Sequence, residues 1–152
     1  MEVGEIFPSF VLKDENGEDF DSKQLAGTRY VIYFYPKDNT SGCTREAVGF
    51  SESLDSFKEL GMPVIGVSKD SVASHRKFVD AQGLTIKLLS DPEHTLLEAS
   101  GAWGTKVMYG KETTGTIRST FIVGKDGKVE AAWRNVKVNG HVEKVLEKAR
   151  SL

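Results

Sequence analysis

The segment from residue 29 to residue 68 constrains the fold more than any other part of this chain. Arg29–Tyr35 is a β-branched and aromatic run typical of a central strand, and Pro36 ends it. Apolar residues then recur every three or four positions over residues 41–60, which predicts an amphipathic helix. Pro63–Ser68 is again typical of a buried strand. A strand, a crossover helix and a second strand place the chain in the α/β class.

Hydrophobic periodicity and turn residues predict the other elements. In chain order we expect a hairpin over 10–20 around Asn16-Gly17, a helix over 71–82, a strand over 86–89, a short helix opened by Asp91-Pro92, a long loop over 101–116, a hairpin of strands 119–123 and 128–133, and a helix over 141–150. Helical crossovers give parallel strand pairs and hairpins give antiparallel ones. We therefore predict a central mixed sheet flanked by helices with an N-terminal β-hairpin, an order that fits a thioredoxin-like fold.

Composition limits the class of protein. A chain of 152 residues, 39% hydrophobic and 28% charged, suits one globular domain over residues 1–152. The net charge of −2 with interspersed acids and bases argues against a nucleic-acid or anionic-membrane partner. The amino terminus lacks the pattern of a secretory signal, and no apolar run is long enough to span a membrane. We expect a cytoplasmic protein.

Cys43 is the only cysteine, which excludes an internal disulfide and a multi-cysteine zinc site. If Thr40 is the helix N-cap, Cys43 is the third helical residue. Unpaired backbone N–H groups and the helix dipole stabilise an anion there, so the position suits a reactive thiolate. The alternative is an inert thiol on an apolar helix face. Gly42 does not belong to a phosphate-binding loop, because the required glycine and lysine spacing is absent.

The histidines show no metal-ligand pattern. His75, His94 and His141 lie in separate segments, so we expect surface or capping roles for them and no bound metal. Trp103, with Met108-Tyr109, is a candidate for lining the site or an interface, and apolar packing is the alternative.

A family resemblance adds to these observations. Pro36, Thr40 and Cys43 match the PxxxTxxC signature of peroxiredoxins, and the surrounding residues resemble the bacterioferritin-comigratory, or peroxiredoxin Q, branch. The similarity continues nearly to the end of the chain, through Leu89-Ser90-Asp91, Trp103-Gly104, Met108-Tyr109-Gly110-Lys111 and Arg118-Ser119-Thr120-Phe121-Ile122.

The resemblance implies roles for five residues. Cys43 is the peroxidatic nucleophile and becomes a sulfenic acid, while Thr40 and Arg118 bind the peroxide and polarise its transition state. Pro36 shields the pocket, and Glu46 orients the arginine. The alternatives are that Thr40 is only a cap, that Arg118 is a solvated strand residue, and that Glu46 is a surface charge.

The chain also departs from the branch. Val48 and Val79 stand where many members carry a resolving cysteine, and Ser41 stands where proline is usual. An external thiol must then reduce the sulfenic acid: a small thiol such as glutathione, a thioredoxin- or glutaredoxin-like protein, or a second copy of Cys43.

These inferences lead to one functional hypothesis with two alternatives. We expect a thiol-dependent peroxidase for hydrogen peroxide and organic hydroperoxides, without metal, haem or flavin, and either monomeric or homodimeric. One alternative is a noncatalytic thioredoxin-like redox sensor. The other is an interaction domain with a silent thiol.

Overall fold

The computed structural model describes residues 1–152, apart from the side chains of Lys106 and Met108. Strands and helices alternate along most of the chain. In order, the elements are β1 (Val11–Asp14), β2 (Asp19–Asp21), the 3-10 helix η1 (Ser22–Leu25), β3 (Tyr30–Phe34), α1 (Ser41–Glu52), α2 (Leu54–Glu59), β4 (Val64–Ser68), α3 (Val72–Gln82), β5 (Lys87–Ser90), α4 (Thr95–Ala99), β6 (Trp103–Met108), β7 (Lys111–Thr116), β8 (Ser119–Val123), β9 (Val129–Arg134) and α5 (His141–Ser151).

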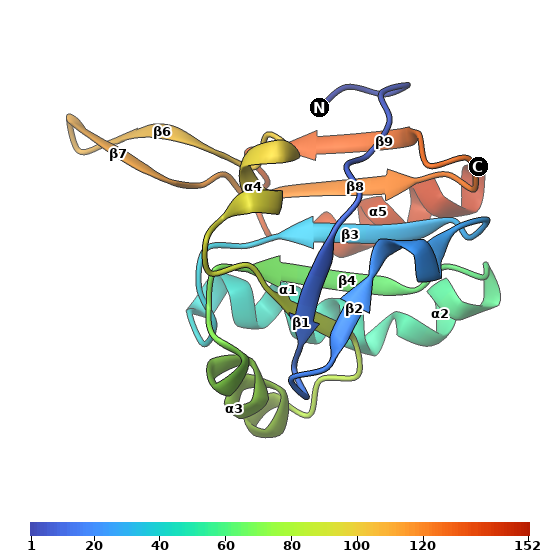
Figure 1. The fold of residues 1–152 in the computed structure, drawn as a ribbon, viewed down its shortest axis with the longest axis horizontal. Coiled ribbons are helices and arrows are strands. Elements are labelled where there is room, and N and C mark those ends of the chain that lie inside the picture. Colours follow the sequence, from blue (N-terminus) through green and yellow to red (C-terminus); the bar gives the residue numbers. More distant parts are fainter.

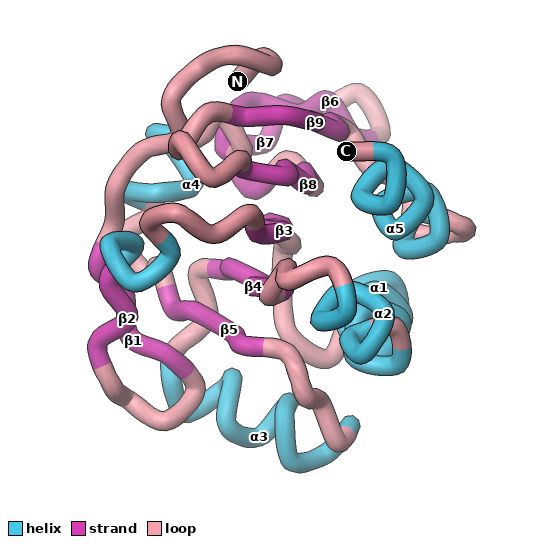
Figure 2. The backbone as a smooth tube through the Cα atoms, turned by 90° about the vertical axis from the view of Figure 1, so that its right-hand side faces the viewer, coloured by secondary structure: helices cyan, strands magenta, loops and turns pink.

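A mixed sheet in the order β2-β1-β5-β4-β3-β8-β9 runs through the molecule (Figure 1). β3 is parallel to β4 and β4 to β5, whereas β8 is antiparallel to both β3 and β9. Helices α1, α2 and α5 lie on one side of the sheet, and α4 lies on the other (Figure 2). The predicted α/β architecture with an N-terminal hairpin is confirmed.

Strand β3 separates two hydrophobic cores, because its side chains alternate between the faces of the sheet. Val31 and Tyr33 belong to the core under α1, α2 and α5, and Ile32 and Phe34 belong to the core under α4 and the N-terminal segment. Tyr33 pairs in register with Gly66 of β4. A Cβ atom at Gly66 would lie 2.8 Å from the Tyr33 hydroxyl, so only glycine leaves room for this ring.

The helix predicted over 41–60 is wrong in one respect, because it breaks at Ser53. This residue ends α1 and precedes α2, with φ −92° and ψ 2°. Phe50, Leu54 and Phe57 are nevertheless all buried in the same core. The apolar stripe continues across the break, which is why the periodicity did not reveal it.

The loop predicted over 101–116 is also wrong. It is a hairpin of β6 and β7, which extends away from the main sheet in Figure 1. Tyr109 and Gly110 form its turn with φ of 53° and 76°, the positive values that a tight two-residue turn requires. Tyr109 is 99% exposed, and Trp103 is half-buried against the core under α4 and the N-terminal segment. The side chain of Met108 lies outside the described residues.

The short helix after Asp91 begins later than predicted. His94 has a left-handed φ of 49°, and α4 starts at Thr95 rather than at Pro92. The Asp91 carboxylate still accepts the N–H groups of Thr95 at 3.1 Å and Leu97 at 2.9 Å. Asp91 therefore satisfies the start of the helix from a turn away.

Two of the three histidines are not on the surface. His75 is 0% exposed and His141 is 3% exposed, so the prediction of surface or capping roles is wrong for both. His94 is partly exposed, pairs with Glu98 and stacks on Trp103 with ring centroids 4.2 Å apart.

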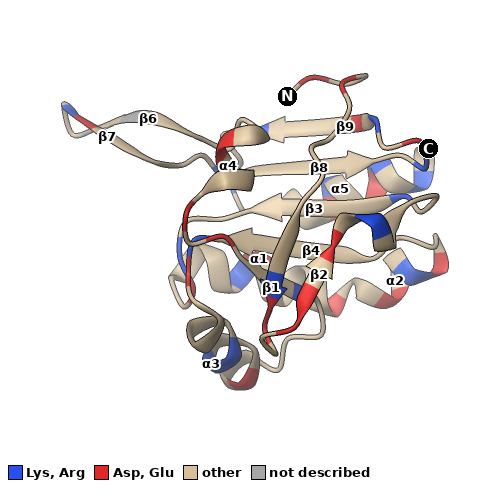
Figure 3. Ribbon diagram, in the orientation of Figure 1, with Lys and Arg blue, Asp and Glu red and all other residues tan. Residues whose placement is uncertain are grey.

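Charge is spread over the molecule in both signs. Figure 3 shows both blue and red residues on the helices and on the N-terminal hairpin, whereas the central strands β3, β4 and β8 are tan. Within the described part of the chain, every helix is too short or too polar to cross a membrane.

Candidate active site

The loop between β3 and α1 delivers the thiol. Thr40 precedes α1 in an extended conformation and its carbonyl accepts the N–H of Thr44 at 2.8 Å, so Cys43 is the third helical residue. The Thr40 side chain does not cap the helix. Its hydroxyl instead donates to the carbonyl of Lys37 at 3.1 Å, within the same loop.

Cys43 lies in a cluster with Glu46 and Arg118. Arg118 comes from the segment just before β8, not from a strand, and its side chain is 16% exposed. Its Nη2 donates to Cys43 Sγ at 3.2 Å and its Nη1 donates to Glu46 Oε1 at 2.6 Å. One guanidinium thus holds the sulfur and a carboxylate together, although 75 residues separate Cys43 from Arg118 in the chain.

Burial and charge oppose each other in this cluster. Glu46 is 0% exposed, and burial raises its pKa to about 7 although the charge of Arg118 and its hydrogen bond act in the opposite direction. Glu46 Oε2 has no hydrogen-bond partner among the described residues. Burial disfavours the charge of Arg118, but the charges of Glu46 and Cys43 outweigh it and raise the arginine pKa. The guanidinium therefore stays charged against the sulfur.

The other two predicted residues lie beside the cluster. Pro36 is half-buried and Thr40 is exposed, both in the loop that precedes α1. Among the described residues Thr40 makes no hydrogen bond to Cys43. The structure therefore joins Cys43, Glu46 and Arg118 directly and places Pro36 and Thr40 in the loop between β3 and α1.

Cys43 has no second thiol to pair with, because it is the only cysteine of the chain. It is in no disulfide and is 1% exposed. Val48 and Val79, the positions compared with resolving cysteines, pack against the core under α1 and α5. Ser41 is the exposed first residue of α1.

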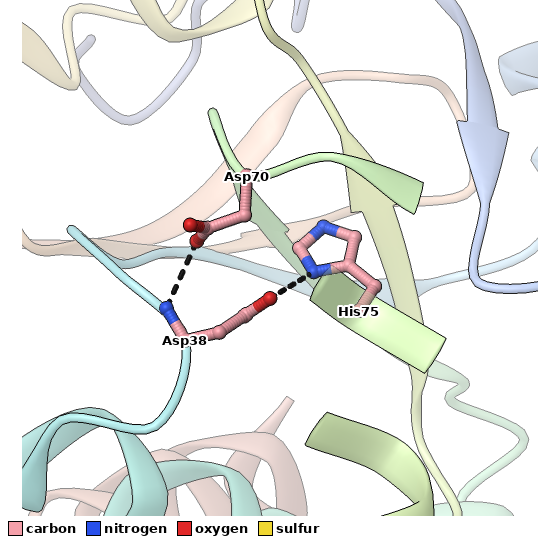
Figure 4. A group of neighbouring side chains, drawn as sticks. All are labelled: Asp38, Asp70 and His75. Carbon is pink, nitrogen blue, oxygen red and sulfur yellow. Dashed lines mark hydrogen bonds and ion pairs between the residues drawn. The ribbon is translucent and has the colours of Figure 1, made fainter. Parts of the chain in front are cut away.

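A second polar cluster, which the sequence reasoning missed, fixes the same loop. Figure 4 shows the Asp38 side chain directed at the ring of His75 and the Asp70 carboxylate directed at the backbone of Asp38. His75 Nδ1 lies 2.7 Å from Asp38 Oδ2, and its Nε2 lies 2.8 Å from the carbonyl of Leu89. Both neighbours are acceptors, so both ring nitrogens carry hydrogen and His75 is a cation.

The pKa shifts agree with this assignment. Burial opposes the charge of His75, but the hydrogen bond and charge of Asp38 outweigh it and raise the histidine pKa. Burial alone would raise the pKa of Asp38, yet the hydrogen bond and charge of His75, followed by hydrogen bonds from Tyr35 and Ser74, lower it. The loop before α1 is thus held by a buried ion pair.

Asp38, Asp70 and His75 are also a candidate group for a metal ion, because one ligand atom of each lies within 4.8 Å of the others. The oxygens are already engaged. Asp38 Oδ2 accepts Ser74 Oγ as well as the His75 ring, and Asp70 Oδ2 accepts Ser68 Oγ and the N–H of Asp38. The donor set therefore fits a hydrogen-bonded network better than a metal centre, in which the imidazole nitrogen must be unprotonated.

Comparisons with known proteins agree with the fold and identify the family. The AhpC/TSA family profile matches residues 3–132. The chain is 43% identical to peroxiredoxin Bcp of Bacillus subtilis over 152 residues, which cover 100% of this chain and 97% of the relative. It is 36% identical to peroxiredoxin Bcp of Escherichia coli over 146 residues, which cover 96% and 94%.

Solved structures of peroxiredoxin Q are also similar to this chain. Peroxiredoxin Q of Xanthomonas campestris superposes with a TM-score of 0.89 at 42% identity, over 93% of this chain and 90% of that one. A variant of peroxiredoxin Q from Xylella fastidiosa gives 0.94 at 36% identity, over 99% and 96%. The predicted thioredoxin-like fold of peroxiredoxin type is confirmed, and these relatives support a peroxidase rather than a noncatalytic sensor. The chain belongs to the AhpC/TSA family, is a peroxiredoxin of the Bcp or Q type, and is a thiol-dependent peroxidase.

Proposed function

We propose that Cys43 is the peroxidatic nucleophile and that it reduces hydrogen peroxide and organic hydroperoxides. The observation that carries the proposal is the forked contact of Arg118, which reaches Cys43 Sγ at 3.2 Å and Glu46 at 2.6 Å. A second solved structure from Xanthomonas campestris, of its bacterioferritin comigratory protein, concerns the alkyl peroxide reduction activity of that protein. That activity supports the same substrate class here.

The first step breaks the O–O bond. The Cys43 thiolate attacks one peroxide oxygen, an S–O bond forms, and the second oxygen leaves as water or alcohol after taking up a proton. Negative charge moves from sulfur to the departing oxygen, so a fixed guanidinium beside the sulfur stabilises the transition state. Glu46 holds Arg118 in place, the Thr40 hydroxyl turns from the Lys37 carbonyl to donate to the peroxide, and Pro36 shields the pocket.

The second step needs a thiol from outside the chain, since the product is a Cys43 sulfenic acid with no internal partner. The external thiol attacks this sulfur and water leaves, and another thiol releases Cys43 from the mixed disulfide. Candidate reductants are a small thiol, a thioredoxin- or glutaredoxin-like protein, or Cys43 of a second copy. We further propose that residues 1–152 act as one domain, as a monomer or homodimer, in the cytoplasm.

Peroxide consumption with dithiothreitol tests the proposal, with Cys43→Ser compared against the wild type. We expect the variant to lose turnover while it keeps the same fold by circular dichroism. Equal rates in the two proteins would remove Cys43 from the reaction.

Mass spectrometry after excess peroxide gives an independent test. Without a resolving thiol, Cys43 should advance to sulfinic and sulfonic acid. A wild-type protein that resists this overoxidation would contradict the one-cysteine mechanism.

A further inference from the structure

A basic groove lies beside Gly42, the residue that precedes Cys43. It has a volume of about 820 Å³ and is formed by the end of β9, the segment that follows it, the start of α5 and one residue of α1. The residues that define the basic groove here are Arg45, Trp133, Arg134, Lys137, His141 and Lys144.

The charge of the basic groove differs from that of the whole chain. The chain carries a net charge of −2, but four lysine and arginine residues line the groove and no aspartate or glutamate does. Elsewhere cations are neutralised locally, as in the Arg29–Glu130 and Arg76–Asp80 pairs. Among the described side chains the four groove cations form no ion pair. The groove therefore presents uncompensated positive charge to a ligand.

Two groove residues are partly engaged by neutral groups. Arg45 donates to the side-chain oxygen of Asn139, and Arg134 donates to the carbonyl of Gly101 at 2.8 Å. These contacts fix the guanidinium groups without removing their charge. His141 adds none, because burial lowers its pKa to about 4 and leaves it neutral near pH 7. Lysine and arginine alone supply the positive field.

The basic groove and the peroxide site share a wall. Gly42 directly precedes Cys43, and a Cβ atom at Gly42 would lie 3.5 Å from Arg118 Nη2 and 3.7 Å from Val138, a groove residue. The N–H of Val136, also in the groove, donates to the carbonyl of Arg118 at 3.0 Å. The groove residues Val136 and Val138 thus lie against Arg118, which contacts Cys43 Sγ, and against the residue that precedes Cys43.

We propose that the basic groove binds the carboxylate groups of a low-molecular-mass anionic thiol and presents its sulfur to oxidised Cys43. This inference rests on the proposed function and names the class of reductant. The volume suits a small molecule, since ligand pockets of roughly 300–1,000 Å³ are typical of such ligands.

The chemistry balances with two molecules of thiol. The sulfur of the first bonds to Cys43 Sγ, the S–O bond of the sulfenic acid breaks, and the hydroxyl leaves as water with a proton. A second molecule attacks the small-molecule sulfur of the mixed disulfide and leaves as a disulfide, and Cys43 is released as a thiol. The two thiols supply the two electrons.

Rapid-mixing kinetics test the proposal step by step. Cys43 is first oxidised with one equivalent of peroxide, and its reduction is then followed with glutathione, with neutral dithiothreitol and with cationic cysteamine. We expect glutathione to reduce the double variant Lys137→Glu/Lys144→Glu with a rate constant roughly tenfold below that of the wild type. Reduction by dithiothreitol should be unchanged and reduction by cysteamine faster. Added salt should slow glutathione alone in the wild type.

Lys148→Glu is the matched control, because Lys148 is exposed on α5 but does not line the groove. It makes the same kind of charge change and should leave the rates with all three reductants unchanged. An equal loss with glutathione and dithiothreitol, or no loss with either, would overturn the groove proposal.

A binding measurement separates this inference from the proposed function. S-methylglutathione has no free thiol, and its binding can be followed by the fluorescence of Trp133 in the groove. We expect saturable binding that Lys137→Glu/Lys144→Glu weakens and Lys148→Glu does not. Binding without oxidation of Cys43 by peroxide would reject the peroxidase mechanism alone, and absence of binding in a protein whose Cys43 oxidises normally would reject the groove alone.

Discussion

Two buried carboxylates, one on each side of Cys43 in the sequence, behave in opposite ways. Asp38 and Glu46 are both almost inaccessible, at 4% and 0% exposure, and each lies against a cation. The pKa of Asp38 is lowered, whereas the pKa of Glu46 is raised to about 7. Burial acts on both carboxyl groups, but Glu46 is the more deeply buried of the two.

The number of hydrogen-bond donors also differs. The Asp38 carboxylate accepts Tyr35 Oη at 2.6 Å, Ser74 Oγ at 2.8 Å and the His75 ring. Glu46 accepts Arg118 alone, and its second oxygen is unpartnered among the described residues. A buried carboxylate keeps its charge when several donors replace water, and one cation does not suffice. Asp38 is thus a fixed anchor for the loop, whereas Glu46 is an anion poised near its titration point.

Replacing Asp38, which anchors the loop, should have the largest effect, and the effect should be on stability. Asp38→Asn removes the carboxylate that is hydrogen-bonded to the buried His75 cation, and we expect the free energy of unfolding to fall by about 3–5 kcal/mol. Urea denaturation measures it, with exposed Asp55→Asn as the control. In the double variant with His75→Gln, the loss should be smaller than the sum of the single losses. Strict additivity would show that the pair does not interact.

Removing the Arg118 cation should slow the reaction of Cys43 with peroxide. Arg118→Gln takes away the charged donor beside Cys43 Sγ, and we expect peroxide oxidation to slow by roughly 10² to 10³-fold. Stopped-flow oxidation of the thiol measures this rate. Arg76→Gln, which breaks an exposed pair with Asp80, is the control. An unchanged oxidation rate would remove Arg118 from the mechanism.

Replacing the poised carboxylate should have a milder effect on rate. In Glu46→Gln the amide oxygen can still accept Arg118, and the amide nitrogen takes the place of an oxygen that has no partner among the described residues. We expect a loss of about tenfold, or 1.4 kcal/mol, in the same oxidation assay. A loss as large as that of Arg118→Gln would mean that Glu46 does more than orient the arginine.

The smallest effect should appear in the pH dependence of stability. Because the folded protein raises the Glu46 pKa from 4.5 to about 7, it binds the proton more tightly than the unfolded chain, and Glu46 lowers stability as pH rises across this range. His141 acts oppositely: its pKa is lowered from 6.5 to about 4, so the unfolded chain binds the extra proton and stability rises with pH over that interval.

Glu46→Gln removes only the falling contribution. The free energy of unfolding of this variant should therefore rise more steeply between about pH 4.5 and pH 6.5 than that of the wild type. Urea titrations at several pH values measure the slopes, and exposed Glu147→Gln should follow the wild-type curve. Parallel curves for Glu46→Gln and the wild type would contradict the raised pKa.

The comparison also shows what the sequence could predict. The place of Cys43 at the third position of α1 followed from local helix rules, because a cap and an apolar stripe are features of neighbouring residues. The roles of Arg118 and Glu46 were predicted only from the family resemblance. The partnership of Asp38 and His75 had no such signal, since 37 residues separate them and only the packing of α3 against the loop brings them together.

Two wrong predictions about secondary structure also have local causes. The hairpin of β6 and β7 turns on Tyr109 and Gly110, whereas the usual signal for such a turn is an asparagine or aspartate before the glycine. Its glycines and threonines therefore suggested a loop. Ser53 interrupts the helix, but the apolar residues on both sides of it lie on the same face. Hydrophobic periodicity depends only on that face, so it does not reveal the break.

The close approach of Tyr33 to Gly66 has a consequence for which sequences this fold can tolerate. In a library of all substitutions at position 66, β-branched residues should rank high by strand propensity alone. The first added carbon would instead meet the Tyr33 hydroxyl at 2.8 Å and displace a ring that stacks on Phe50 of α1, the helix that carries Cys43. Selection for peroxidase turnover in such a library should therefore return glycine at position 66, a residue outside the cluster of Cys43, Glu46 and Arg118.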